Sequence, residues 1–225
     1  MSRDYGQYCG LARALDVVGD RWNLLIVRQL LLGPARYREL RDGLSGIATN
    51  LLTERLRDLQ TAGVVERRLS DDGRAVSYAL TDWGAQLREP IYALVRWSTP
   101  LMVRGPQGDE FRPEWLALAL PALFAGRTPA DRSTVGIAVE GGMVQLRTTE
   151  SGIEVGMPDG RELDAVLHTE APVVLGLAAG VLSLDDIAAL VHIDGDASAL
   201  RSFFGAPATD PSGSTPIPDT APGRR

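Results

Sequence analysis

The sequence has one cysteine, two histidines and no lysine. A single cysteine, Cys9, excludes an intrachain disulfide framework and a zinc site built from several cysteines. Because His168 and His192 are the only histidines that could bind a metal ion together with Cys9, we expect no metal site. We also expect no cofactor. No apolar run reaches the roughly 18 residues that cross a bilayer. The N-terminus MSRDYGQYCG lacks the apolar core of a secretory signal, so we expect a cytoplasmic protein without membrane insertion.

The signals of catalysis are also missing. His168 lies in a predicted strand and His192 near the start of another, and neither accompanies a Gly-x-Ser-x-Gly element or a cysteine partner. The glycines of AVEGGMV indicate a hairpin turn rather than a loop that holds phosphate. We therefore expect that the protein is not an enzyme.

Basic residues are all arginine, and they are unevenly placed. Residues 1–100 contain 14 Arg and 12 acidic residues, a balance of +2, whereas residues 101–225 contain 9 Arg and 17 acidic residues, a balance of −8. A polyanion is therefore expected to bind the first part of the chain, because the second part repels it.

The chain divides into segments that differ in composition. At 225 residues it is long enough for two modest domains. The polar stretch RGPQGDEFRP is typical of a linker, and the last twenty residues, with five prolines, have too little apolar surface to fold. We expect α+β architecture, divided into a first domain (1–103), a linker (104–113), a second domain (114–205) and a disordered tail (206–225).

The first domain begins with helices and continues with a hairpin. Apolar periodicity and turn residues predict helices at 9–18, 20–32, 37–44 and 46–62. Asp-Gly in SDDGR predicts the turn of a hairpin between strands 64–69 and 75–80. Thr81 then caps a long helix from Asp82 to Val103, which Pro90 is expected to bend.

The helix GIATNLLTERLRDLQTAG has two different faces. Leu52, Leu56 and Leu59 share one side. The opposite side is polar and, taken alone, would be a solvated surface. The order of short helix, turn, amphipathic helix and hairpin is instead typical of a winged helix-turn-helix, whose second helix enters the major groove of DNA.

Several polar side chains are candidates for DNA contact. Asparagine can bind adenine through two hydrogen bonds, arginine binds guanine or phosphate, and a helix N-terminus favours phosphate. The candidates are Thr49, Asn50, Thr53, Glu54 and Arg57 on the helix, and Arg67, Arg68 and Arg74 in or beside the hairpin. Arg55 either joins them or pairs with Glu39 or Asp58, and Glu54 is either a base reader or an orienting charge.

Residues 9–98 resemble the HxlR family of bacterial winged-helix regulators, relatives of the MarR group. The matching pieces are CGLARALDVVGDRWNLLIVRQLLLGPARYREL, GIATNLLTERLRDLQTAGVVERR and YALTDWG. The resemblance implies a homodimeric transcription factor, with repression as its mode, that binds a pseudo-palindromic operator in double-stranded DNA. It also implies dimerisation through the N-terminal helix and the long helix after the wing.

Cys9 falls where some members of that family carry a thiol that senses oxidants. The start of the adjacent helix is expected to lower its pKa, and one cysteine per subunit permits an intersubunit disulfide. The alternative is an inert small residue near the dimer interface.

The second domain is predicted to combine an apolar helix, EWLALALPALFAG, with an antiparallel sheet. Its strands are TVGIAVEG, GMVQLRTTE, GIEVGMP and ELDAVLHTE, followed by helices PVVLGLAAG and LSLDDIAALV, a strand near HIDGD and the helix ASALRSFFG. This order resembles the sterol carrier protein fold. The resemblance implies an apolar tunnel for a hydrophobic small molecule.

The tunnel walls would come from apolar residues of the predicted helices. They are Trp115, Leu116, Leu120, Leu123, Phe124, Val173, Leu177, Val181 and Leu182. The same side chains would equally make a packed core. A regulator controlled by the bound molecule is one reading, and a lipid carrier whose helix-turn-helix serves only dimerisation is another.

Overall fold

The computed structural model describes residues 4–69, 75–102, 105–127, 129 and 131–205. The chain separates into two compact units, Met1–Ala93 and Leu94–Arg225. The division falls inside the helix α6 (Arg88–Met102), before the boundary that we expected at residue 103. Arg74 and the predicted disordered tail, 206–225, lie outside the described residues.

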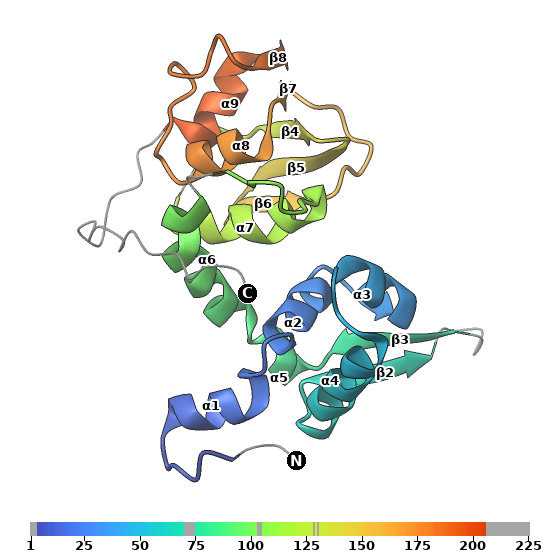
Figure 1. The fold of residues 1–225 in the computed structure, drawn as a ribbon. Helices are drawn as coiled ribbons and strands as arrows, with labels where there is room; N and C mark the ends of the chain where they lie inside the picture. Colours follow the sequence, from blue (N-terminus) through green and yellow to red (C-terminus); the bar gives the residue numbers. More distant parts are fainter. Residues whose placement is uncertain (1–3, 70–74, 103–104, 128, 130, 206–225) are drawn as a thin grey trace. The chain divides into compact units, whose positions relative to one another are not determined.

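The first unit has the expected order of helix, turn, helix and hairpin (Figure 1). Its elements are α1 (Gly10–Val18), α2 (Asn23–Leu31), β1 (Ala35–Arg36), α3 (Tyr37–Gly43), α4 (Thr49–Thr61), β2 (Val65–Leu69), β3 (Val76–Leu80) and α5 (Asp82–Ala85). The chain leaves α4 through Gly63, whose φ of 76° is the left-handed conformation typical of a helix end.

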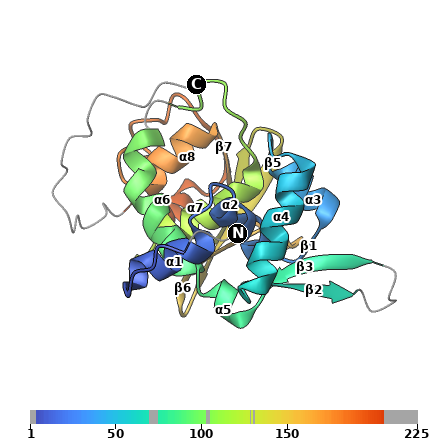
Figure 2. The same ribbon diagram turned by 60° about the horizontal axis from the view of Figure 1, so that its bottom comes forward.

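The hairpin belongs to a sheet of three antiparallel strands in the order β1-β3-β2 (Figure 2). The strand β1 was not predicted, because two residues are too few to show the alternation of polar and apolar residues that marks a strand. It pairs Ala35 with Tyr78 and Arg36 with Ser77. The segment that leads into α3 is thereby attached to the hairpin through β3.

The single helix predicted from Asp82 to Val103 is wrong in one respect, because the chain forms two helices there. Thr81 caps the first as expected, since its Oγ1 accepts a hydrogen bond from the Gly84 N–H at 3.0 Å. The second, α6, begins at Arg88, so Pro90 lies in its first turn. A proline has no N–H and its ring clashes with the carbonyl four residues earlier, so the helix restarts there instead of bending.

The second unit contains a five-stranded sheet with helices (Figure 1). Its elements after α6 are the 3-10 helix η1 (Pro113–Trp115), α7 (Leu116–Leu123), β4 (Thr134–Val139), β5 (Gly142–Thr149), β6 (Gly152–Gly156), β7 (Ala165–His168), α8 (Ala171–Ala178), β8 (His192–Gly195) and α9 (Ala197–Phe204). The helices α7 and α9 contact the sheet, at β6 and at β4 and β7 respectively.

The prediction of an antiparallel sheet is wrong at its centre. The strand order is β6-β5-β4-β7-β8, and β4 and β7 run parallel. The hairpins from β4 to β6 build outward on one side of β4. The chain then returns through residues 157–164 and adds β7 on the other side of β4, in the same direction as β4. A series of short predicted strands suggests successive hairpins. The sequence therefore did not indicate that β7 pairs with β4 in parallel.

The helix predicted for LSLDDIAALV is also wrong, because residues 181–190 form turns. Asp186 accepts hydrogen bonds from the Ser183 N–H at 3.0 Å and from the Ser183 hydroxyl at 2.6 Å. The Asp186 N–H in turn donates to Ser183 Oγ at 3.2 Å, and this reciprocal pair is the arrangement of a helix start, yet the residues that follow form turns. Leu184 and Ile187 are nevertheless buried, so the segment packs on the core without being helical. No helix among the described residues is long and apolar enough to span a bilayer.

Candidate nucleic-acid interface

The helix α4 is held to the first unit by its leucines. Leu52, Leu56 and Leu59 are fully buried, as their spacing predicted. On the other side Thr49, Asn50, Thr53, Glu54 and Arg57 are exposed. Burial of the leucines fixes the rotation of α4 about its axis, and this rotation presents the polar side chains to solvent.

The N-terminal turn of α4 is open to an anion. The residue before the helix, Ala48, has an extended backbone and provides no side-chain cap, and the first turn contains no acidic residue. The first backbone N–H groups therefore have no intrahelical partner and no competing carboxylate next to them. A phosphate group fits such a helix end.

Tyr37 positions this turn, a role that was not predicted from the sequence. The Tyr37 hydroxyl donates to the backbone carbonyl of Thr49 at 2.8 Å and lies 3.3 Å from Thr53 Oγ1. Thr53 Oγ1 in turn donates to the Thr49 carbonyl at 3.0 Å. The first residue of α3 thus holds the start of α4, so Thr53 serves local structure as well as the exposed face. A tyrosine that opens the preceding helix was the only signal in the sequence.

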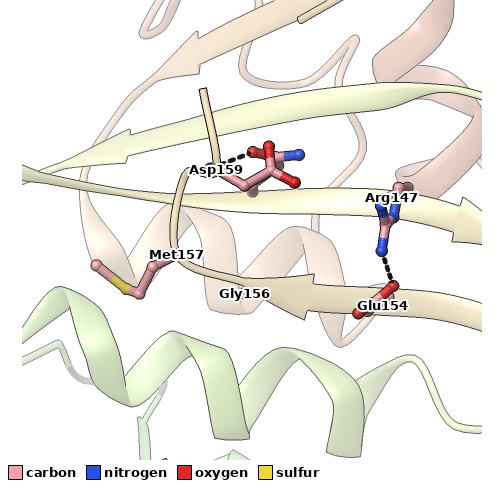
Figure 3. A pocket seen from close by; sticks show the side chains of 6 residues that line it. Arg147, Glu154, Gly156, Met157 and Asp159 are labelled. Atoms are coloured by element: carbon pink, nitrogen blue, oxygen red, sulfur yellow. Dashed lines mark hydrogen bonds and ion pairs between the residues drawn. The ribbon is translucent and has the colours of Figure 1, made fainter. Parts of the chain in front are cut away.

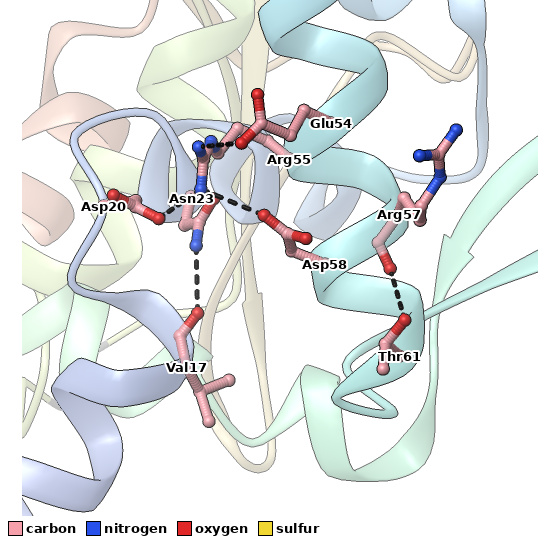
Figure 4. Close-up of polar contacts among 8 residues, drawn as sticks. All are labelled: Val17, Asp20, Asn23, Glu54, Arg55, Arg57, Asp58 and Thr61. Carbon is pink, nitrogen blue, oxygen red and sulfur yellow. Dashed lines mark hydrogen bonds and ion pairs between the residues drawn. The ribbon is translucent and has the colours of Figure 1, made fainter. Parts of the chain in front are cut away.

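Arg55 belongs to an ionic cluster that fixes α4 (Figure 4). Its guanidinium pairs with Asp58 at 3.0 Å, with Glu54 at 2.8 Å and with Asp20, which lies before α2. The Arg55 side chain is only 14% exposed. The pairing with Asp58 that the sequence suggested is therefore confirmed, and Glu54 orients Arg55.

The alternative partner of Arg55, Glu39, is engaged elsewhere. Its carboxylate accepts a hydrogen bond from the Arg36 backbone N–H at 2.6 Å, at the start of α3. The pairing of Arg55 with Glu39 is therefore wrong. The sequence could not distinguish these acidic residues, and it gave no sign of Asp20, which is 35 positions from Arg55.

Asn23 makes a buried polar contact between α1 and α2, which the sequence did not predict. Its side-chain Nδ2 donates to the Val17 carbonyl at 2.9 Å, which ties α1 to the start of α2 (Figure 4). The residue is almost completely buried. An exposed asparagine and a buried one look alike in a sequence, and only Asn50 is on the surface.

Arg57 differs from Arg55 in that its guanidinium extends away from the cluster (Figure 4). Among the described residues no carboxylate forms an ion pair with Arg57, and no side chain forms a hydrogen bond with Asn50. Both side chains are exposed. Their polar groups are therefore available to an external partner, which is the property that direct reading of a base requires.

The two arginines of β2 point to opposite faces of the hairpin. Arg67 is paired with Tyr78 across the strands and Arg68 with Ser77, and neighbouring residues of a strand alternate between faces. Arg68 forms an ion pair with Glu66 at 2.7 Å. Arg67 is exposed, and among the described residues no carboxylate pairs with it. Arg67 is therefore the better placed of the two for phosphate contact.

Cys9 is exposed at the start of α1. The backbone N–H groups of Ala12 and Leu11 hold the pKa of its thiol below the ordinary value. The sequence predicted this direction from the helix start. A lowered pKa increases the thiolate fraction near neutral pH, and thiolate is the reactive form.

Most of the residues predicted to line a ligand tunnel pack as the core of the second unit. Leu116, Leu120, Phe124 and Leu177 are buried there, and Leu123, Val173 and Leu182 pack against them. Trp115 is half-buried with its ring perpendicular to that of Phe111, and Val181 is 64% exposed. The tunnel among these side chains stays a prediction.

A small polar pocket lies elsewhere in the second unit, beside β5 and β6 (Figure 3). Its volume is about 60 Å³, and Arg147 pairs there with Glu154. The Asp159 N–H donates to the side chain of Gln145 at 3.2 Å. None of the predicted tunnel residues lines this pocket. Its lining is charged and already ion-paired, Arg147 with Glu154 and Asp159 with Arg161, so it does not resemble a site for a hydrophobic molecule.

His168 and His192 are neighbours across β7 and β8. Both Nε2 atoms lie at hydrogen-bond distance from the carboxylate of Asp194, at 2.9 and 2.8 Å. These bonds hold the pKa of Asp194 below its ordinary value. Nothing in the sequence indicated that the two histidines meet.

The chain is similar to known regulators over part of its length. The model of the HxlR-like helix-turn-helix family matches residues 17–105. YvaP of Bacillus subtilis, an HTH-type transcriptional regulator, is 35% identical over 88 residues, which are 39% of this chain and 82% of YvaP. YodB of the same organism, also an HTH-type transcriptional regulator, is 34% identical over 86 residues, 38% of this chain and 77% of YodB.

A solved structure is similar over a comparable share of the chain. The reduced form of YodB from B. subtilis is 30% identical to this chain, with a TM-score of 0.39, and the match covers 44% of this chain and 99% of that one. Each of these three matches covers less than half of this chain.

Proposed function

This chain belongs to the HxlR-like helix-turn-helix family of transcriptional regulators, and we propose that α4 reads the major groove of its operator through Asn50 and Arg57. The observation that carries the proposal is the division of polar residues on α4. Arg55 and Glu54 are used to fix the helix, whereas Asn50 and Arg57 are exposed and have no such partner among the described residues. Asparagine and arginine are the side chains that bind adenine and guanine through paired hydrogen bonds.

Phosphate contacts complete the proposed interface. The open N-terminal turn of α4 and the exposed guanidinium of Arg67 would bind the DNA backbone and set the position of the helix. The Arg55 guanidinium offsets one of the three acidic charges around it, which reduces their repulsion of the DNA backbone. With a balance of only +2 in the first hundred residues, we expect modest affinity per subunit and easy release.

Two copies would bind together. Leu94, Trp97 and Leu101 are exposed and lie on one side of α6, at positions i, i+3 and i+7, and Leu11 and Leu15 are exposed on α1. Large apolar side chains at regular helical spacing favour burial against a second copy. A twofold dimer would bind a pseudo-palindromic operator with half-sites about 34–36 Å apart, and as a repressor it would block transcription there.

The experiment that tests DNA binding is titration of duplex DNA at several salt concentrations. The logarithm of the affinity should fall linearly with the logarithm of salt, because phosphate contacts release counterions. The rival reading, a lipid carrier whose helix-turn-helix serves only dimerisation, predicts no such binding. A flat or absent response would contradict the regulator.

A thiol-sensing function is the second candidate, supported by the exposure of Cys9 and the lowered pKa of its thiol. Diamide would accept the two electrons and two protons that are released when two Cys9 thiols join in an intersubunit disulfide. We expect diamide to release DNA from the wild-type protein and not from Cys9→Ser. Equal release from both proteins would eliminate this function, while leaving DNA binding untouched.

Control by a hydrophobic molecule in the second unit stays a prediction, because the residues expected to line its tunnel form core contacts. Incubation of the purified protein with a lipid extract, followed by mass spectrometry of the retained species, would detect such a ligand. A consistently empty protein would contradict both the effector and the sterol-carrier reading.

A further inference from the structure

His168, His192 and Asp194 form a cluster at one edge of the sheet in the second unit, and the proposed DNA interface does not use it. The sheet order ends with β7 and β8, so β8 is an edge strand (Figure 1). His168 in β7 lies directly opposite His192 in β8. These are the two histidines of the whole chain, and the fold brings them together.

The core determines which way the three side chains of the cluster point. Leu167 is fully buried, Ile193 packs against the same core, and the two are paired across the strands. Because neighbouring residues of a strand alternate between faces, His168, His192 and Asp194 lie on the face away from the core. All three are exposed. The strands therefore hold the backbone of the cluster firmly, while its side chains are open to solvent.

The two imidazoles face the same small region. Their ring centroids are 5.6 Å apart, and the ring planes are inclined at 43°. His168 Nε2 lies 2.9 Å from one carboxylate oxygen of Asp194, and His192 Nε2 lies 2.8 Å from the other. Two imidazole nitrogens directed at one point are suited to chelate a transition-metal ion, because imidazole is a good ligand for Zn²⁺, Ni²⁺ and Cu²⁺.

The contacts that the cluster makes by itself are weak. Pairs between exposed charged or polar side chains are screened by water and contribute little to stability. Both histidines and Asp194 are of this kind. An ion that replaces the hydrogen bonds between them therefore displaces only weak contacts.

Charge favours a cation at this position. The hydrogen bonds from His168 and His192 hold the pKa of the Asp194 carboxyl below its ordinary value, so the carboxylate is ionised at neutral pH. Among the described residues no arginine forms an ion pair with Asp194. Residues 101–225 have a balance of −8. Both the local carboxylate and the wider field attract a positive ion.

We propose that His168 and His192 chelate one divalent transition-metal ion through their Nε2 atoms, beside the carboxylate of Asp194. Coordination places the proton of each neutral ring on Nδ1, so no proton is lost. Asp194 gives up its hydrogen bonds from Nε2 and balances part of the charge of the ion.

The site has two protein ligands, and water completes the coordination of the ion. In the described part of the chain no group of three or more His, Cys, Asp or Glu side chains is arranged to hold a metal ion. The expectation of no metal site rested on the small number of ligands in the sequence, which does not show that two of them meet across strands. The site does not depend on the proposed DNA binding.

The test is titration of the untagged full-length protein with zinc chloride, measured by calorimetry and by NMR of the histidine rings. Two histidines give two Cε1–H signals, and we expect both to shift together and to saturate at one Zn²⁺ per chain. His168→Gln and His192→Gln should each weaken binding at least about tenfold, the effect typical of losing even a hydrogen-bond partner of a ligand. Cu²⁺ should bind more tightly than Zn²⁺, and Mg²⁺, which prefers oxygen ligands, should not bind.

Three further variants separate ligand, charge and thiol. Asp194→Asn removes a charge but no ligand, so it should weaken Zn²⁺ binding less than either histidine replacement. Glu150→Gln is its matched control, because it removes an exposed carboxylate at the turn between β5 and β6, on the far side of the sheet, and it should bind Zn²⁺ normally. Cys9→Ser removes the one thiol of the chain and should also bind normally.

Several results would overturn the site. They are absence of Zn²⁺ binding, a shift of only one histidine signal, unchanged affinity in either histidine variant, and loss of binding in Cys9→Ser. A larger loss in Asp194→Asn than in the histidine variants would assign the ion to the carboxylate and would also contradict the proposal. The NMR titration of the wild type decides the question even if a variant fails to fold.

Discussion

Arg55 and Arg57 lie two residues apart on α4, yet they have opposite surroundings. Arg55 is enclosed by three carboxylates, and Arg57 extends into solvent. Helical periodicity could predict which side of α4 is buried, because the leucines determine it. It could not separate the tasks of the two arginines, because Asp20 comes from the distant turn before α2. At the residue scale, the exposed face of α4 was predictable, whereas the ion-pair partners of Arg55 were not.

Replacement of Arg55 by glutamine should destabilise the first unit. The change leaves Asp20, Glu54 and Asp58 close together without a counter-charge, at a cost of about 1–2 kcal/mol, because the carboxylates are themselves half exposed. The measurement is the free energy of unfolding in urea.

The matched control for that measurement is Arg41→Gln. Arg41 pairs with Asp42 on the surface of the same unit, so its loss should change stability by less than about 0.5 kcal/mol. Equal unfolding curves for Arg55→Gln and the wild type would show that the cluster does not hold α4.

Short connecting residues decide how the elements of the first unit meet. Thr81 accepts a hydrogen bond from Gly84 N–H at the start of α5, and its hydroxyl also donates to the Gly63 carbonyl at the end of α4 at 2.7 Å. The sequence predicted the first bond from the preference of threonine for helix caps. The second was not predictable, since it depends on the fold bringing residues 18 positions apart together.

Thr81→Ala should lower the free energy of unfolding by about 1–2 kcal/mol, because the helix cap and the link to α4 are both lost. Thr81→Ser keeps the hydroxyl and is the control, expected within about 0.5 kcal/mol of the wild type. Urea unfolding of the three proteins makes the comparison. A loss in Thr81→Ser as large as that in Thr81→Ala would indicate that the methyl group, not the hydroxyl, is important.

Elements with strong periodicity were predictable, and elements that depend on distant pairing were not. The leucine spacing of α4 and the Asp-Gly turn identified helix and hairpin. The parallel pairing of β4 and β7 and the turns of residues 181–190 were missed. In both, the outcome depends on contacts with distant parts of the chain: the return to β4 in the first and the packing of Leu184 and Ile187 on the core in the second.

At the scale of the whole molecule, charge and apolar surface are distributed for different tasks. The excess of acidic residues after residue 100 leaves the first part of the chain as the place for DNA. Exposed apolar side chains on α1 and α6, in contrast, favour protein contact. The sequence indicated both helices as dimerisation elements only through the family resemblance.

Leu11→Glu should convert the proposed dimer to a monomer, because it would place a charge in a buried apolar contact. Leu11 is 68% exposed in one copy, so the fold of the subunit should not change. Leu190→Glu is the control, since Leu190 is a comparably exposed leucine of the second unit. Sedimentation velocity distinguishes the two states. A Leu11→Glu protein that sediments as the wild type would place the interface elsewhere.

The central claim is that α4 reads bases through Asn50, and selection of bound duplexes from a random pool tests it most directly. The wild type, Asn50→Ala and the control Gln86→Ala, which removes an exposed amide beyond α5, are compared at one salt concentration. We predict that Asn50→Ala loses about 1–3 kcal/mol of discrimination at one base pair of each half-site, whereas Gln86→Ala selects the same sequences as the wild type. Unchanged base preference in Asn50→Ala would contradict the account.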